Sequence, residues 1–271
     1  MRLISQMRWL GKLVGLFFSM NMRSTINYYR WSFVWVYIAH VLGYINSYII
    51  IWGSMRSFDG IGAWSMQDVM FLYTFDLLSY SLANMFAQPF WNWDELVGKG
   101  KLDDYLIRPM SPLLHVVLRD IQFGYIAHIS VSIGAFALLL HYTNALWGGM
   151  MFAQFGIALI GAFLIQVSFG ILPSCIGFRW IRADQLASLV RWDSRNFIQY
   201  PIVIYPAWLR FVLSSIIPIA FVNYYPSLTL LQKDSPIGMY GPLCTLAIGV
   251  TLLVLTLVVW KKSLRRYSSS G

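Results

Sequence analysis

Long apolar runs alternate with short charged segments along the whole chain. The clearest run, Trp31–Gly53, has 23 residues and no acidic or basic side chain apart from the titratable His40. A helix of about 20 apolar residues crosses the hydrocarbon core of a bilayer, which is about 30 Å thick. Comparable runs recur at residues 68–89, 121–142, 146–178 and 240–260. The pattern therefore predicts a series of transmembrane helices, with the bilayer as their solvent.

The region between residues 196 and 232 is also apolar, but four prolines interrupt it: Pro201, Pro206, Pro218 and Pro226. An internal proline removes a backbone donor and bends a helix, so one straight span is not expected there. A span followed by a re-entrant or outer-leaflet helix fits this region better. We therefore expect an all-α integral membrane protein with six transmembrane helices and a Pro-broken re-entrant region before the last one.

The first thirty residues contain five basic and no acidic side chains. Apolar residues recur among them at helical spacing, namely Leu3, Met7, Leu10, Val14 and Phe17. This spacing predicts an amphipathic interfacial helix on the cytoplasmic membrane surface. A signal peptide is the rival interpretation, but no small-x-small cleavage site follows the apolar run at residues 13–20. The expected organisation is an interfacial helix at residues 1–30, one six-span domain at residues 31–265 and a polar cytoplasmic tail at residues 266–271.

The distribution of charge supports the membrane interpretation. Charged residues make up 11% of the chain, against about 25% in an average soluble domain. The net charge of +9 would suit a nucleic-acid binder, but 17 of the 20 Lys and Arg residues fall on one side of the predicted topology. The exceptions are Arg56, Arg210 and Lys233. By the positive-inside rule both termini face the cytoplasm, and we expect membrane lipids rather than nucleic acid as partners.

The predicted cytoplasmic connector at residues 94–120 is longer than a turn between two spans requires. Gly100 and Pro109 bound the sequence KLDDYLIR, which is long enough for about two helical turns. Leu102, Tyr105 and Leu106 fall on one face at positions i, i+3 and i+4. The other face carries the charged residues Lys101, Asp103, Asp104 and Arg108. A short two-faced helix parallel to the membrane is expected, and a solvated loop helix without a partner is the plainer alternative.

The segment Gly100–Ser111, GKLDDYLIRPMS, resembles the G-x-L-D-x-x-L-x-R-P signature of bacterial ABC exporter permeases of the type-2 class, specifically the branch of short six-span subunits. Two further stretches, Gln199–Pro206 and Ile217–Pro226, resemble the same branch. With the basic N-terminal helix and the order of the spans, the resemblance extends over nearly the whole chain.

This resemblance implies that the short helix is a coupling helix, seated in a groove of a separate ABC ATPase (nucleotide-binding) subunit. The residues thereby assigned to ATPase coupling are Lys101, Leu102, Asp103, Asp104, Tyr105, Leu106, Arg108 and Pro109. It also implies a second permease subunit, so that a homodimer or a pair with a paralogue encloses the translocation path. The expected function is the permease subunit of an ATP-driven exporter, multi-pass in a bacterial plasma (inner) membrane.

The sequence offers no machinery for catalysis. Gly98–Lys101 lacks the spacing of a Walker A loop, and no H-E-x-x-H, G-x-S-x-G or Cys/His zinc spacing occurs. A chain of 271 residues with several spans also leaves no room for an ATPase domain. We therefore expect a chain that is not an enzyme and has no cofactor of its own, with ATP and Mg bound by the partner subunit.

Polar residues inside the predicted spans are candidates for the translocation path. Asp76 is the only acidic residue deep within a predicted span, and His40, Asn84 and Gln88 are weaker candidates. A buried carboxylate costs several kcal/mol unless it pairs, faces water or is protonated, and a structural hydrogen bond between helices is the alternative role. Two other functions stay open: a proton-coupled secondary transporter that uses Asp76 and His40, and an intramembrane enzyme, for which no nucleophile or metal constellation is found.

Overall fold

The computed structural model describes residues 2–56, 62–91, 96–97, 99–142, 147–177 and 199–267. These residues form helices, and no β-strand occurs among them, in agreement with the all-α expectation. The long helices are α1 (Arg2–Arg56), α2 (Met66–Ala87), α5 (Tyr125–Tyr142), α6 (Gly149–Gly177) and α11 (Gly241–Leu264). The short segments between them are η1 (Gln88–Trp91), α3 (Lys101–Leu106), α4 (Pro112–Arg119), η4 (Ile202–Ile204), α9 (Ala207–Phe211), η5 (Val212–Ile216), η6 (Ile219–Phe221), α10 (Tyr224–Leu230) and η7 (Gly238–Tyr240).

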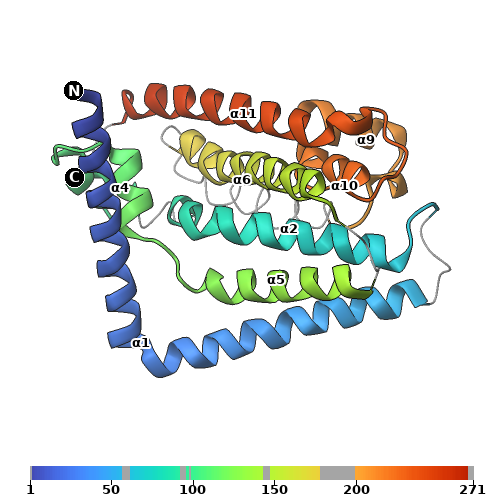
Figure 1. Cartoon of the computed structure of the whole chain (residues 1–271). Helices are drawn as coiled ribbons and strands as arrows, with labels where there is room; N and C mark the ends of the chain where they lie inside the picture. Colours follow the sequence, from blue (N-terminus) through green and yellow to red (C-terminus); the bar gives the residue numbers. More distant parts are fainter. Residues whose placement is uncertain are drawn as a thin grey trace.

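The long helices form a bundle in which α2, α5, α6, α11 and the second part of α1 run side by side (Figure 1). The first part of α1 turns across one end of this bundle and passes beside α4. The start of α1 and the end of α11 both lie at this end, which we call the α4 end. Helices α9 and α10 lie at the opposite end, which we call the α10 end. The two chain termini therefore leave the bundle on the same side.

Helix α2 is the central element, because it packs against α1, α5 and α6. A capping box fixes its start: the Ser65 hydroxyl accepts a hydrogen bond from the Asp68 N–H, and the Asp68 carboxylate accepts one from the Ser65 N–H at 2.7 Å. Every side chain from Phe71 to Ser79 is buried. Since nine consecutive helical positions point in all directions, α2 has protein neighbours on every side.

The described residues confirm part of the expected set of spans, and the count of six stays a prediction. Within the described part of the chain, four helical segments are long and apolar enough to cross a membrane: Val34–Arg56, Tyr125–Tyr142, Gly149–Cys175 and Gly238–Leu264. A fifth is obtained if Ala207–Ile216 and Ile219–Leu230 form one broken span, because the chain bends by 74° between them. Helix α2 is absent from this group, since Asp68, Asp76 and several amides and hydroxyls lower its hydropathy. The described residues thus provide four to five candidate spans, and the position of the bent pair relative to a membrane stays a prediction.

The expected interfacial helix and the first expected span form one continuous helix, α1. Helical hydrogen bonding continues through Arg30 and Trp31, and Figure 1 shows that the helix changes direction along its length. Large apolar side chains on the second part are exposed, including Trp31, Trp35 and Leu42 at 76%, 69% and 60%. The spacing of Ile181, Leu186, Leu189, Val190 and Trp192 also predicts an amphipathic helix at residues 179–195, and this segment lies outside the described residues.

Helices α6 and α11 approach each other most closely at two glycines. A Cβ atom on Gly161 would lie 2.6 Å from the backbone nitrogen of Leu246, and a Cβ on Gly249 would lie 2.6 Å from the carbonyl oxygen of Gly161. Small residues allow such backbone contact between membrane helices, where dispersion and packing replace the hydrophobic effect as the driving force. This contact holds the last helix against the bundle.

We expect Gly161→Ala to destabilise the protein by about 1–3 kcal/mol, because the added methyl group meets backbone that cannot move aside. Gly156→Ala on the same helix is the matched control, since nothing lies within 4 Å of a Cβ there. Alanine favours a helix over glycine by up to about 1 kcal/mol, so the control should be neutral or slightly stabilised. Thermal unfolding of the purified variants measures both effects, and equal midpoints for the two variants would contradict the close contact.

Candidate functional site

The short helix α3 begins directly after a glycine in a left-handed conformation. Gly100 has a φ of +70°, and its carbonyl accepts a hydrogen bond from the Asp103 N–H at 3.1 Å. A residue with a Cβ adopts this conformation only at a cost. Gly100 therefore lets the chain turn sharply into α3, at the boundary that the sequence predicts.

Leu102 and Tyr105 attach α3 to the ends of the bundle helices. Their side chains are 0% and 1% exposed. They belong to one apolar cluster with Phe90 of η1, Ile171 and Cys175 of α6, and Trp260 of α11. The rings of Phe90 and Trp260 pack edge to face with centroids 5.4 Å apart. We call this cluster the α3 seat, and it connects α3 mechanically to both α6 and α11.

Leu106 does not share the α3 seat, contrary to the expectation that it lies on one face with Leu102 and Tyr105. It is 41% exposed. The reason is angular: i+3 and i+4 lie about 100° apart around a helix, on either side of position i. The buried direction falls between Leu102 and Tyr105, so Leu106, the last residue of α3, turns outward.

The outward surface of this segment includes a residue that the sequence interpretation missed. Ile107, which directly follows α3, is 83% exposed, and Asp104, Arg108 and Pro109 are exposed beside it. The sequence did contain a signal for Ile107, because a connector between spans rarely leaves an isoleucine exposed to water among charged residues. We call Leu106, Ile107, Arg108 and Pro109 the outward tip.

Helix α4 joins the outward tip to the N-terminal part of α1. The His115 ring, 2% exposed, stacks on Tyr105 with centroids 4.5 Å apart, and Phe17 packs against its edge at 5.9 Å. The side-chain amide of Asn21 donates a hydrogen bond to the carbonyl of Leu118 at 2.8 Å. Parts of α1, α3 and α4 thus form one packed unit at the α4 end.

The surroundings of His115 disfavour its charged form. Burial lowers the pKa of the imidazole, and the nearby guanidinium groups of Arg108 and Arg119 lower it further, against an opposing effect of Asp120. Neither ring nitrogen has a hydrogen-bond partner among the described residues. Burial also raises the pKa of the Tyr105 hydroxyl, and the Asp120 carboxylate adds to this shift. His115 is therefore neutral at pH 7, and its protonation would place an uncompensated charge inside the unit.

Asp76, the main candidate for the translocation path, lies between α2 and α6. It is 1% exposed. The amide of Gln166 on α6 lies 3.5 Å from Asp76 Oδ1 and donates a 2.8 Å hydrogen bond to the Ser79 hydroxyl. These contacts give Asp76 and Ser79 an interhelical hydrogen-bonding role within one chain.

The other path candidates lie elsewhere. His40 Nδ1 lies 2.7 Å from the carbonyl of Val36, and its ring faces His128 of α5 at 4.6 Å. Asn84 donates from its amide to the carbonyl of Tyr80 in its own helix, and Gln88 is half-buried in η1. Asp76 and His40 therefore pack in two different helix interfaces, α2 with α6 and α1 with α5.

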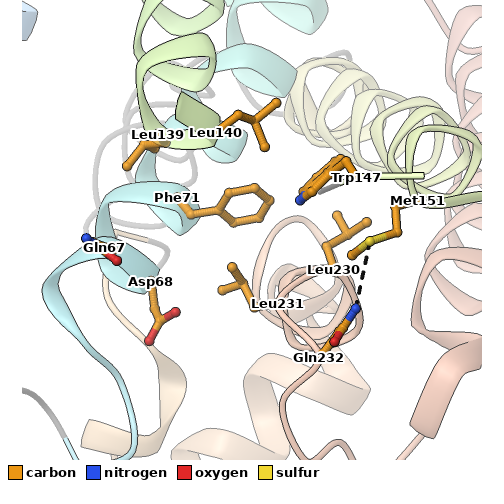
Figure 2. A pocket seen from close by; sticks show the side chains of 10 residues that line it. All are labelled: Gln67, Asp68, Phe71, Leu139, Leu140, Trp147, Met151, Leu230, Leu231 and Gln232. Carbon is orange, nitrogen blue, oxygen red and sulfur yellow. Dashed lines mark hydrogen bonds between the residues drawn. The ribbon is translucent and has the colours of Figure 1, made fainter. Parts of the chain in front are cut away.

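A cavity of about 350 Å³ opens at the α10 end, and no sequence pattern indicated it. Figure 2 shows apolar side chains from α2, α5, α6 and α10 around it, with Gln67 and Asp68 on the α2 side and Gln232 next to Met151. In the ranges that the structure describes, no group of three His, Cys, Asp or Glu residues is arranged to hold a metal ion.

The fold and the α3 seat define a multi-pass membrane protein with a structured segment at one end of its bundle. Residues 38–271 match the family model described as ABC-2 family transporter protein. The chain therefore belongs to the ABC-2 transporter family and is a membrane permease component of an ABC transporter, a transport subunit that is not itself catalytic and that associates with an ABC ATPase subunit. No curated relative and no solved structure matches the chain.

We expect the packing of α4 on α3 to weaken in acid. In the unfolded segment the histidine has a pKa of about 6.5, and in the folded unit the pKa of His115 is lower. The stabilising contribution is therefore complete above about pH 6.5 and declines as the pH falls from there toward the folded pKa. Hydrogen-exchange protection of residues 101–119, corrected for intrinsic rates, measures it between pH 7.5 and 5.5. His115→Phe keeps an aromatic ring and cannot titrate, so the same pH profile in both proteins would refute this role.

Proposed function

We propose that the chain is the permease subunit of an ATP-driven exporter and that α3 is its coupling helix. Two permease subunits, identical or paralogous, enclose the translocation path and associate with two ATPase subunits that bind ATP and Mg. The outward tip enters a groove on the ATPase. Movement of the ATPase is then transmitted through α3 to the membrane helices.

The observation that carries this proposal is the division of α3 into an anchored and a free side. Leu102 and Tyr105 are buried in the α3 seat against α6 and α11, whereas Ile107 is 83% exposed. Interfaces gain most of their affinity from apolar or aromatic anchors that become buried in a partner pocket. A force applied to Ile107 passes to two long helices through buried side chains, which resist displacement because protein interiors are close-packed.

The topology that we propose has six spans, with α2 as one of them. Its 22 residues extend about 33 Å at 1.5 Å per residue, which suits a hydrocarbon core of about 30 Å. Its low hydropathy is compatible with spanning because its buried polar groups face protein rather than lipid. Both termini lie in the cytoplasm of a bacterial inner membrane, where the positive-inside rule places the basic α4 end, and the bent pair, which lies wholly at the α10 end, forms the re-entrant region.

The exposed apolar side chains of α1 support a lipid-facing or subunit-facing surface. Trp31, Trp35 and Leu42 are more exposed than a soluble protein of this size would leave a whole helix face. By contrast, the proton-coupled alternative gains no support, since Asp76 and His40 pack in different helix interfaces.

Replacing Ile107 tests the proposal directly. Ile107→Ala removes an anchor whose burial in a partner stabilises the complex by about 1.5–3 kcal/mol, so the ATPase should bind about 10–100-fold more weakly. Co-purification of the ATPase with the tagged full-length chain measures this loss. The isolated chain should keep its normal abundance and thermal stability, because the side chain is 83% exposed.

Two further variants make the result specific. Met239→Ala removes a side chain that is 66% exposed at the α10 end and should leave ATPase binding unchanged. Leu102→Ala removes a fully buried side chain and should instead destabilise the chain itself, by about 2–5 kcal/mol. If Ile107→Ala retains the ATPase as well as Met239→Ala does, α3 is not the coupling helix.

Single cysteines at the two ends of α11 test the orientation. Lys262 and Met239 are both exposed, near the α4 end and the α10 end respectively. With Cys244 replaced by serine and the native Cys175 buried, an impermeant maleimide should label Met239→Cys in intact cells and Lys262→Cys only after the membrane is permeabilised. The reverse labelling would place the outward tip outside the cell, where no ATPase can reach it.

A further inference from the structure

The cavity at the α10 end has the size and shape of a small-ligand site. It lies between the first turns of α2, the last turn of α5, the beginning of α6 and the end of α10 (Figure 2). Its volume of about 350 Å³ lies within the range of about 300–1,000 Å³ that is usual for ligand pockets. It is separated from the α3 seat by the length of the bundle, so it is a different site.

The apolar wall of the cavity is held in place by an aromatic cluster. Phe71, 4% exposed, lies 5.8 Å from Phe136 and 6.0 Å from Trp147, measured between ring centroids. Phe155 stacks on Phe136 at 4.7 Å behind them. Rings that pack on one another in this way have little freedom to collapse into the space. The wall is therefore preformed for an apolar body.

An ion pair beside the cavity fixes the position of α10 relative to α2. Lys233 Nζ lies 2.8 Å from Asp68 Oδ2, donates to the carbonyl of Ala63 at 2.8 Å and lies 5.4 Å from the Trp64 ring centroid. The Asp68 carboxylate also accepts hydrogen bonds from the N–H and hydroxyl of Ser65. Its charge is thus matched within the protein, and the cavity offers no net charge to attract an ion.

Neutral hydrogen-bonding groups remain around the space. Gln232 has a φ of +54°, the one positive φ outside glycine in the described chain, and its amide lies 3.8 Å from the sulfur of Met151 at the cavity. Figure 2 shows the nitrogen end of the Trp147 indole directed toward the cavity and Gln67 at its edge. A non-glycine residue in this conformation is strained unless its surroundings hold it. The contact with Met151 holds the exposed Gln232 amide at the rim of the cavity, where a ligand head group would lie.

We infer that this cavity binds an uncharged amphiphile. Its short alkyl or aryl body lies against Phe71 and Leu140, and a hydroxyl or carbonyl group bonds with Gln232 or the Trp147 N–H. A bilayer lipid that inserts a chain and a free amphiphile share this chemistry. The inference requires the fold alone and holds with or without an ATPase.

Photolabelling of the full-length chain in liposomes tests the site. The first probe is decanol that carries an aliphatic diazirine, and the second is a phosphatidylethanolamine with a diazirine in one acyl chain. Peptide mass spectrometry should place saturable decanol labelling on the peptides that contain Leu140 or Met151, with competition by unlabelled decanol. If the phospholipid labels the same peptides and prevents decanol labelling, the natural occupant is a bilayer lipid; if it does not, the occupant is a free amphiphile.

Two substitutions on α5 separate the cavity from the lipid surface. Leu140→Trp fills the cavity, and saturable labelling should fall about tenfold or more, a loss equal to about 1.4 kcal/mol of binding. Leu138→Trp makes the same change two positions away, on a side chain that is 57% exposed, and should have no effect. Labelling that does not saturate, or that falls equally in both variants, overturns the inference.

A third variant keeps the test decisive if Leu140→Trp fails to fold. Gln232→Gly retains the positive φ at no steric cost and removes the side chain together with its amide. It should weaken labelling by the decanol probe and leave labelling by the corresponding decane probe unchanged. Equal decanol labelling in the variant and the native chain overturns the assignment of the head group to Gln232.

Discussion

The central position of α2 depends on internal partners for its polar side chains. Gln166 reaches the Asp76 carboxylate and the Ser79 hydroxyl from α6, and Tyr48 of α1 shares a 2.8 Å hydrogen bond with Thr74. In hydrocarbon each of these groups would cost several kcal/mol if left unsatisfied. The remaining helices must therefore surround α2, and the outer faces of α1, α5 and α11 are the surfaces that face lipid.

Helix α2 also connects the two ends of the molecule. Its first turn carries Asp68, which pairs with Lys233 beside the cavity, and it continues into η1, where Phe90 enters the α3 seat. The close contact of Gly161 with α11 joins α6 and α11, the other two long helices that contribute to the α3 seat. The cavity and the α3 seat are thus attached to the same helices, which gives the fold a continuous packed path from one end to the other.

Much of the local structure could be predicted from the sequence. Apolar run lengths located α5, α6, α11 and the second part of α1, and the glycine and proline boundaries located α3. The signature around Gly100 led to the family that the match over residues 38–271 confirms. The separation of Leu106 from Leu102 and Tyr105 was not readable, because spacing defines which residues are neighbours on a helix but not the direction from which the bundle covers it.

Composition and periodicity determined that this chain is helical, that it belongs in a membrane and that its basic residues gather on one side of the predicted topology. Each of these properties depends on local sequence and on the free energy of transfer from water to lipid. Only the tertiary structure decided which polar residues meet. It placed Asp76 beside Gln166, 90 positions away in sequence, and His40 beside His128. It also left Ile107 exposed and enclosed the cavity beside Phe71. Contacts between distant segments depend on the packing of whole helices, for which a single sequence contains no local signal.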